Sequence, residues 1–283
     1  MSASERASAQ LEAQGGAPRR LRAVLCTRGG LFGAVVLSTL RSCERIELCG
    51  IVRSSRVFHP ACGFVAGAWA YVRRSGIAYS LYLLTATSVA DTLCRFGRIA
   101  RVPTRTRELG IPVHTTRDLN AADGLSFLRA RAPDVLISAF FDQRLNAATL
   151  GIPRHGGVNI HPSLLPSFKG VDPVLQARLR GVARIGVTVH YMTPELDCGT
   201  ILAQRAFAPP AGSSIFAATA RLFREGAQLL TAETDRIGRG DPGVPQPDPG
   251  DYQSWPSPRE IRALRGTGTV LIRASDLAAI TRM

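Results

Sequence analysis

One segment constrains the fold of this 283-residue chain more than any other, residues 156–202, which read GGVNIHPSLLPSFKGVDPVLQARLRGVARIGVTVHYMTPELDCGTIL. Its first residues are typical of a strand with two apolar side chains on one side and Asn159 and His161 on the other, because side chains alternate along a strand. A proline-bounded loop and a short helix from Pro173 follow, and a second strand covers 185–192. Elements in this order predict an α/β fold with a mostly parallel central sheet.

The end of the second strand brings a carboxylate toward the same place. The turn that follows reads TPELDCG and carries Asp197. Open α/β sheets bind their ligands at the carboxyl ends of the strands. We therefore expect Asn159, His161 and Asp197 to converge at one edge of the sheet, where an amide, an imidazole and a carboxylate can act together.

These two motifs, NIHPSLLPSFKG and VTVHYMTPELDCGTIL, resemble the catalytic core of the folate-dependent formyltransferases. That family includes glycinamide ribonucleotide formyltransferase, methionyl-tRNA formyltransferase and the sugar N-formyltransferases. The resemblance is strong over residues 134–204 and traceable back to residue 21. It implies a Rossmann-like formyltransferase fold and transfer of a formyl group from 10-formyltetrahydrofolate, the co-substrate, to a primary amine.

Transfer of a formyl group to an amine needs hydrogen-bond donors, because attack on the carbonyl carbon creates an oxyanion. Asn159 can donate to that oxygen without titrating. His161 can donate to the same oxygen and, when protonated, supply a proton to the leaving nitrogen. Asp197 would orient the imidazole and take up the proton that the attacking ammonium loses. These three residues are the expected catalytic group.

The resemblance also implies which loops hold the folate. The turn at 141–145 aligns with the loop whose backbone holds the pterin edge in the family, and the loop at 192–197 would close the other side of the pocket. In any fold of this class both could simply be turns between a strand and a helix. The residues expected to contact the folate are Gln143, Arg144, Leu145, Met192, Thr193, Glu195 and Leu196.

Ser163, Lys169 and Asp172 are candidate contacts to the amine that accepts the formyl group. Asp172 could pair with a cationic amine, or it could be the N-cap of the helix beginning at Pro173, since proline is favoured at the first helical position. The two roles are compatible. The glycine turn at 28–30 is shorter than the phosphate-binding turn of the resembling purine enzyme, which argues against a ribonucleotide substrate.

Residues 58–97 are an apolar and aromatic insertion into a connection that is shorter in the purine enzyme. Arg73, Arg74 and Asp91 interrupt its apolar windows, so no transmembrane helix is predicted. We expect two helices packed against the domain, with a groove or lid for a hydrophobic substrate, or membrane contact through 62–92, as alternatives. The rings of interest are Trp69, Tyr71, Tyr79 and Tyr82.

The chain divides into an expected disordered tail at 1–20, a catalytic domain at 21–209, and a C-terminal helix, linker and small α/β extension at 210–283. Within the extension, the sequence predicts a capped helix over 257–265 and a strand over 269–272. The extension could shape the acceptor site or form a homodimer contact. It is shorter than the tRNA-binding barrel of methionyl-tRNA formyltransferase, which favours a small-molecule amine such as an amino sugar or an intermediate of a specialised metabolite.

A net charge of +14 would ordinarily suggest a nucleic-acid partner, but the arginines are scattered, without a basic run interleaved with aromatic residues. A nucleic-acid partner is therefore not favoured. Methionyl-tRNA formyltransferase-like activity stays an alternative, as do formyltetrahydrofolate hydrolysis and non-catalytic folate binding. The six cysteines have no metal-binding spacing, so no metal site is expected. With no secretory signal, these features suggest a cytoplasmic protein.

Overall fold

The structure is a computed structural model that describes residues 19–59, 61, 63–89, 102–208, 212–247 and 250–282. The tail expected at 1–20 lies outside these residues except for its last two positions. The insertion expected at 58–97 is described as far as residue 89, apart from positions 60 and 62.

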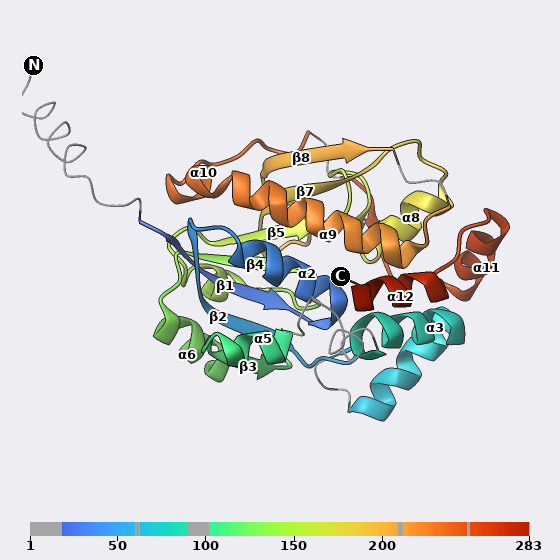
Figure 1. Ribbon diagram of the computed structural model, residues 1–283, viewed down its shortest axis with the longest axis horizontal. Helices are drawn as coiled ribbons and strands as arrows, with labels where there is room; N and C mark the ends of the chain where they lie inside the picture. Colours follow the sequence, from blue (N-terminus) through green and yellow to red (C-terminus); the bar gives the residue numbers. More distant parts are fainter. Residues whose placement is uncertain are drawn as a thin grey trace, which may run out of the picture.

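The centre of the molecule is a sheet of seven strands (Figure 1). They are β1 (Leu21–Thr27), β2 (Ile46–Ser54), β3 (Val113–Thr116), β4 (Val135–Ala139), β5 (Gly157–His161), β7 (Ile185–Tyr191) and β8 (Ile201–Phe207). Their order across the sheet is β3-β2-β1-β4-β5-β7-β8. The first five are mutually parallel, and β7 pairs antiparallel with both β5 and β8. The predicted α/β fold with a mostly parallel sheet is confirmed.

The position of each strand follows from its side chains. All five residues of β4 are buried, as a strand covered by helices on both faces requires. At the edge of the sheet, only the last residue of β3 is buried. Because β2 lies on one side of β1 and β4 on the other, the chain reverses its direction of winding between β1 and β4. A crevice forms at the carboxyl ends of the strands at such a switch point.

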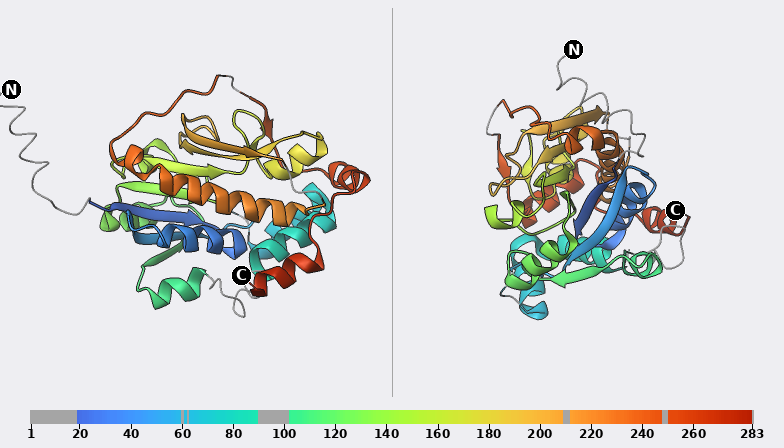
Figure 2. Two further views of the ribbon diagram at one scale, coloured as in Figure 1. Left: turned by 45° about the horizontal axis from the view of Figure 1, so that its top comes forward. Right: turned by 90° about the vertical axis from the view of Figure 1, so that its left-hand side faces the viewer.

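Two helices, α2 (Gly30–Arg41) and α9 (Ile215–Ala232), lie side by side over one face of the sheet (Figure 2). A Cβ atom at Gly226 of α9 would lie 2.3 Å from Cγ2 of Ile160 in β5. Glycine is therefore what permits α9 to approach the sheet this closely. The opposite face is covered by α6 (Ala122–Arg131), which contributes to a second, smaller apolar cluster.

The boundary expected at residue 209 does not separate two cores. Phe216 and Phe223 of α9 pack against Phe32 of α2, with ring centroids 5.3 Å and 5.6 Å apart. These rings belong to the same apolar cluster as the central strands. The catalytic core therefore includes α9, which the sequence analysis assigned to the C-terminal extension.

The rest of the C-terminal segment is mostly helical. The strand expected at 269–272 is wrong: the backbone carbonyls of Val270 and Leu271 accept hydrogen bonds from the first two N–H groups of α9 instead. These carbonyls thus cap a helix and are not available to a sheet. The predicted capping box is present at the start of α11 (Pro258–Gly266). The remaining short elements are α5 (Val102–Glu108), α7 (Ala147–Leu150), β6 (Lys169–Gly170), α8 (Pro173–Leu179), α10 (Thr234–Gly238), β9 (Tyr252–Gln253) and α12 (Ala274–Arg282).

The insertion forms α3 (Phe64–Leu84), followed by one π-helical turn over Thr85–Val89. Gly76 has a φ of 82° and interrupts α3, so the insertion consists of two helical segments, as expected. Three of its tyrosines are buried, whereas Trp69 is 62% exposed. Among the described residues, no helix is long and apolar enough to cross a membrane.

Candidate active site

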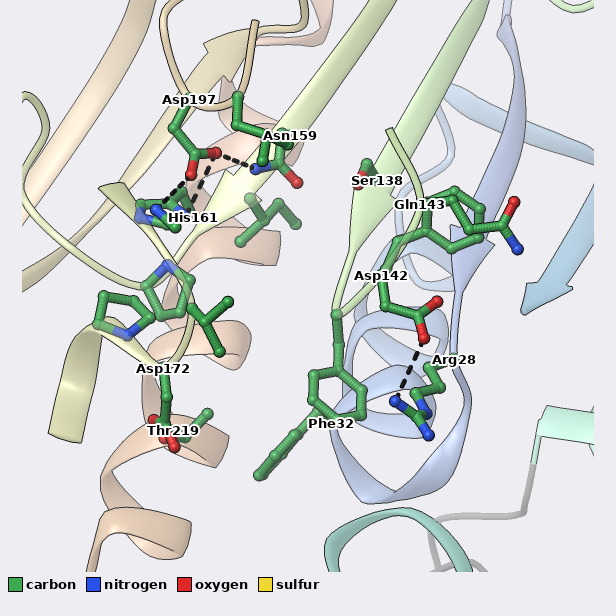
Figure 3. A pocket seen from close by; sticks show the side chains of 18 of the residues that line it. Arg28, Phe32, Ser138, Asp142, Gln143, Asn159, His161, Asp172, Asp197 and Thr219 are labelled. Atoms are coloured by element: carbon green, nitrogen blue, oxygen red, sulfur yellow. Dashed lines mark hydrogen bonds and ion pairs between the residues drawn. The ribbon is translucent and has the colours of Figure 1, made fainter. Parts of the chain in front are cut away.

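A cavity of about 400 Å³ opens where β1, β4 and β5 end (Figure 3). Arg28 reaches it from the turn after β1, and residues 140–145 reach it from the loop after β4. Asn159 and His161 line it from β5 itself. The cavity therefore occupies the switch point of the sheet, where ligands bind in open α/β folds.

The structure brings the amide, the imidazole and the carboxylate of the sequence motif together. Asn159 Nδ2 lies 3.5 Å from Asp197 Oδ1, and His161 Nδ1 lies 3.6 Å from the same oxygen. Figure 3 shows Asp197 between the other two side chains. All three residues line the cavity. Residues 38 positions apart along the chain thus meet because the 192–200 loop folds back over the end of β5.

Asp197 is fixed by a backbone N–H group and by a side-chain amide. Its Oδ2 accepts a hydrogen bond of 2.8 Å from the N–H of Gly170, and Gln246 donates to its carbonyl oxygen at 2.8 Å. Burial by itself would raise the pKa of Asp197, but His161, His190 and the Gly170 N–H outweigh it and hold that pKa well below its usual range. Asp197 is therefore a carboxylate throughout the neutral pH range.

His161 is buried and has both ring nitrogens directed at protein groups. Nε2 lies 3.0 Å from the carbonyl oxygen of Phe168, which can only accept, so this nitrogen carries the proton of a neutral ring. Nδ1 faces Asp197. Burial lowers the pKa of His161 below its ordinary value despite the opposing charge of Asp197. This geometry fits a group that accepts a proton better than it fits the direct oxyanion donor expected from the sequence.

A second histidine joins the group. His190 Nε2 lies 3.1 Å from Asn159 Nδ2 and 3.6 Å from Asp197 Oδ1, and its Nδ1 lies 2.7 Å from the carbonyl oxygen of Tyr191. The sequence motif did not place His190 among the expected catalytic residues. The antiparallel register of β5 and β7 pairs Asn159 with His190. The sequence shows the alternation within each strand but not which residues of the two strands lie opposite each other, so this neighbour could not be found from it.

The two loops expected to hold folate both reach the cavity. Gln143 is 4% exposed, and its amide binds Leu119, Ser54 and Thr116, which fixes the loop rather than leaving the side chain free. Arg144 donates a hydrogen bond of 2.9 Å to the carbonyl oxygen of Pro194 and so ties the two loops together. Of the residues expected to contact folate, the cavity is lined by Gln143, Arg144, Leu145, Met192, Thr193 and Leu196.

Three of the candidate contacts do not line the cavity, namely Glu195, Ser163 and Lys169. The Ser163 hydroxyl donates to the Ser167 carbonyl at 2.8 Å, which holds the proline-bounded loop. The Lys169 amine is buried and lies 3.4 Å from the Cys198 sulfur. Ser163 is thus bound within its own loop, whereas Lys169 contacts the loop that carries Asp197.

The side of the cavity away from the two loops expected to hold folate is aromatic, and we call it the acceptor wall after the role proposed for it below. It consists of Phe58, Tyr71, Tyr79, Tyr82 and Trp255. Sequence reasoning singled out the three tyrosines but missed Phe58 and Trp255, because no local pattern indicates that the C-terminal segment reaches the insertion. The carboxylate at this wall is Asp172, which occupies the N-cap position of α8 but makes no side-chain capping hydrogen bond.

Comparison with known proteins identifies the family. Residues 100–232 match the family model described as formyl transferase. This stretch belongs to the formyl transferase family. The resemblance inferred from the sequence motifs is therefore confirmed, and both β5 and the loop that carries Asp197 lie within the matched residues.

Two relatives that resemble this chain in sequence match it over less than half of their own length. Methionyl-tRNA formyltransferases from Roseiflexus sp. and Chloroflexus aggregans are each 40% identical to it over 132 residues, which is 47% of this chain. The match covers 41% and 43% of those two proteins, so the chain spans less than half of their length.

Solved structures support the same fold. Glycinamide ribonucleotide transformylase 1 from Symbiobacterium toebii superposes with a TM-score of 0.55 at 18% identity, covering 81% of this chain and 95% of that one. The N-formyltransferase from Helicobacter canadensis, solved with folinic acid and dTDP-3-aminofucose, superposes with a TM-score of 0.53 at 13% identity, covering 85% and 72%. At these identities the likeness concerns the fold alone.

Proposed function

We propose that this formyl transferase moves a formyl group from 10-formyltetrahydrofolate to the primary amine of a small molecule. The observation that carries the proposal is the convergence of Asn159, His161 and Asp197 on one wall of a cavity of about 400 Å³. That volume lies in the range of ordinary small-molecule sites. The acceptor classes that fit best are an amino sugar and an amine intermediate of a specialised metabolite.

One side of the cavity is suited to bind the folate. We assign the folate to the side lined by Leu145, Met192 and Leu196, where an apolar surface suits a ring system and the tied backbone of the two loops offers peptide groups. The formyl donor supplies the one-carbon unit that is transferred. A related N-formyltransferase is known with folinic acid bound, which supports a folate at this site.

Asn159 is the proposed oxyanion donor. Its amide nitrogen carries two protons, of which one is directed at His190 Nε2 at 3.1 Å and the other at Asp197 Oδ1 at 3.5 Å. The longer contact to Asp197 is the one that we expect to be exchanged for the formyl oxygen as charge develops there. The neighbouring Asp197 and His190 fix the amide and thereby reduce the reorganisation needed during the reaction.

His161 and Asp197 are the proposed proton acceptors. As the bond between the amine nitrogen and the formyl carbon forms, the ammonium must lose one proton. A neutral His161 with Asp197 beside Nδ1 can take that proton, because the resulting imidazolium would be paired with Asp197 at one nitrogen and with the Phe168 carbonyl at the other. The same proton can then pass to the folate nitrogen as its bond to the formyl carbon breaks.

The test is to incubate the protein with 10-formyltetrahydrofolate and follow tetrahydrofolate release with and without a panel of primary amines. Release that depends on an amine, with formylated amine detected by mass spectrometry, is the expected result. Release without any amine would identify a hydrolase, and no release under either condition would identify a folate-binding protein. Either result would overturn the proposal.

A second candidate function rests on the relatives, which are named methionyl-tRNA formyltransferases. The same assay with methionyl-tRNA as the acceptor separates the two candidates. A catalytic efficiency for methionyl-tRNA far above that for every small amine would favour the second. We expect the reverse, because the acceptor side of the cavity is covered by α3 and Trp255.

A further inference from the structure

The acceptor wall is a continuous set of rings. Tyr71 and Trp255 lie with ring centroids 5.0 Å apart, Tyr79 and Tyr82 lie 5.6 Å apart, and Phe58 packs edge-on against Tyr71 at 5.1 Å. These rings come from the insertion and from the C-terminal segment, outside the motif that carries the chemistry. A wall of this composition offers π faces to whatever part of the acceptor is not reacting.

One carboxylate at this wall, Asp172, has no cationic partner among the residues that the structure describes. The other carboxylates that line the cavity are matched: Asp142 pairs with Arg28 at 3.2 Å, and Asp197 is held by two histidines. Asp172 Oδ2 instead accepts a hydrogen bond of 3.0 Å from the hydroxyl of Tyr79. The backbone N–H of Leu175 also lowers the pKa of this half-buried carboxyl group. A neutral phenol and a peptide N–H stabilise a carboxylate far less than a cation does.

Both the backbone conformation and the charge of Asp172 are energetically unfavourable. Its φ of 47° lies in the left-handed region, which residues other than glycine adopt at an energetic penalty. Burial raises the pKa of its carboxyl group to about 6, so the ionised form is disfavoured where it stands. A strained backbone and an unmatched charge at the wall of a cavity are typical of a group reserved for a ligand.

Figure 3 shows Asp172 apart from the cluster of Asn159 and Asp197. We therefore assign to Asp172 a group of the acceptor other than the nucleophilic amine. Asp172 is nevertheless near enough to share one ligand with that cluster. The N–H of Gly170 binds Asp197. Asp172 follows Gly170 by two residues, which span at most about 7 Å along the chain.

We propose that the acceptor carries a second cationic group, a few bonds from the amine that is formylated, and that Asp172 and the acceptor wall bind this cation. A carboxylate surrounded by tyrosine and tryptophan faces recognises an organic ammonium through one ion pair and several cation–π contacts. The acceptor class is therefore a diamine or an aminoalkyl ammonium compound. This inference deepens the function proposed above and rests on it for the identity of the reacting amine.

The experiment compares α,ω-diaminoalkanes of two to six carbons with amino alcohols of the same lengths, in which a neutral hydroxyl replaces the second amine. For wild type we expect kcat/KM for the best diamine to exceed that of its amino alcohol at least tenfold. In Asp172→Asn this preference should fall to within about twofold. Asp235→Asn, on exposed α10, is the matched control and should keep the wild-type preference.

Binding measured by calorimetry keeps this inference separate from the proposed function. If no amine is formylated but a diamine binds to wild type and at least tenfold more weakly to Asp172→Asn, the cation site stands and the proposed function fails. If amines are formylated and both proteins treat diamines and amino alcohols alike, the cation site is overturned and the function stands. Failure of every diamine to bind or react overturns the cation site as well.

Discussion

The residues with unusual backbone conformations gather around the cavity. Six described residues other than glycine have a positive φ, and four of them, Phe58, Phe140, Asp172 and Asp197, line the cavity. A fifth, Phe168, presents its carbonyl to His161. Such conformations cost on the order of 1–3 kcal/mol each and persist where the surroundings fix them, most often at functional sites. Three of these five residues, Phe168, Asp172 and Asp197, lie within the sequence motif of 156–202.

Replacing the proposed oxyanion donor tests the chemistry at its centre. We expect Asn159→Ala to lower turnover by at least about 100-fold, because removing one such donor typically costs two to three orders of magnitude. Circular dichroism and the melting temperature should stay near those of wild type, since Asn159 is only partly buried. Turnover within tenfold of wild type, in a folded variant, would remove Asn159 from the mechanism.

The unmatched charge of Asp172 should also appear in the stability of the protein. The pKa of its carboxyl group is about 6 when folded against an ordinary value of 3.8, so the folded state binds this proton more tightly than the unfolded state. The corresponding stabilisation is present below about pH 4 and is lost as the pH rises through about 6. Replacement by asparagine removes this loss, because the amide carries no charge at any of these pH values.

For Asp172→Asn we therefore expect a free energy of unfolding on the order of 1–2 kcal/mol above wild type at pH 8 and no such gain at pH 4. Urea unfolding at the two pH values measures the difference. Asp235→Asn should follow wild type at both. A variant less stable than wild type at pH 8 would contradict the assignment of an unfavourable charge to this position.

At the scale of elements, the strands, the helix and the loop of 156–202 could be predicted because their signals are local. Alternation placed Asn159 and His161 on one side of β5, and proline placed the start of α8. The strand expected at 269–272 failed because its carbonyls are used by α9, a contact between distant parts of the chain. The buried residues of α3 keep a helical spacing from Tyr71 to Tyr82, but what they face could not be predicted, because Trp255 comes from a distant part of the chain.

We expect the break at Gly76 to set the directions in which Tyr71 and Tyr79 point into the cavity. A Cβ at this position would meet only Pro258, at an ordinary 3.6 Å, so the difficulty with alanine is the φ of 82° and not space. We expect Gly76→Ala to lower the free energy of unfolding by about 1–2 kcal/mol. It should raise KM for the amine more than KM for the folate, because Tyr71 and Tyr79 flank the break.

Gly63→Ala is the matched control for this variant. Gly63 precedes the same helix with a φ of −68°, and a Cβ there would contact nothing within 4 Å. Denaturant unfolding and two-substrate kinetics on both variants give the comparison. Equal effects of the two substitutions on KM for the amine would show that the break does not position the wall.

At the scale of the whole molecule, the acceptor side of the cavity is built from three parts of the chain that lie far apart in sequence: Phe58 with the nearby α3, residues 170–174, and residues 252–255. The donor side comes from the compact motif that the family match covers. This division explains why the sequence indicated formyl transfer but left the acceptor open. The donor side follows from one motif, whereas the acceptor side depends on packing between distant segments.

Trp255 closes the acceptor side, and its loss should admit water. We expect Trp255→Ala to increase the ratio of formyl hydrolysis to amine formylation several-fold, because an enclosed site protects reactive groups from solvent. Both products can be followed in one reaction by mass spectrometry. Trp69→Ala, which changes the exposed tryptophan of α3, is the control and should keep the wild-type ratio. An unchanged ratio in both variants would contradict the closure.

The pairing of β6 with β9 joins Lys169 to Tyr252 and Gly170 to Gln253. During synthesis the ribosome releases the motif of 156–202 long before it releases this partner strand. The nascent chain can therefore form the side of the cavity with Asn159 and His161 early. The pairing of Gly170 with Gln253 can form only after residues 252–253 have been synthesised. The acceptor side of the cavity, which includes Trp255, is thus completed after the side that carries Asn159 and His161.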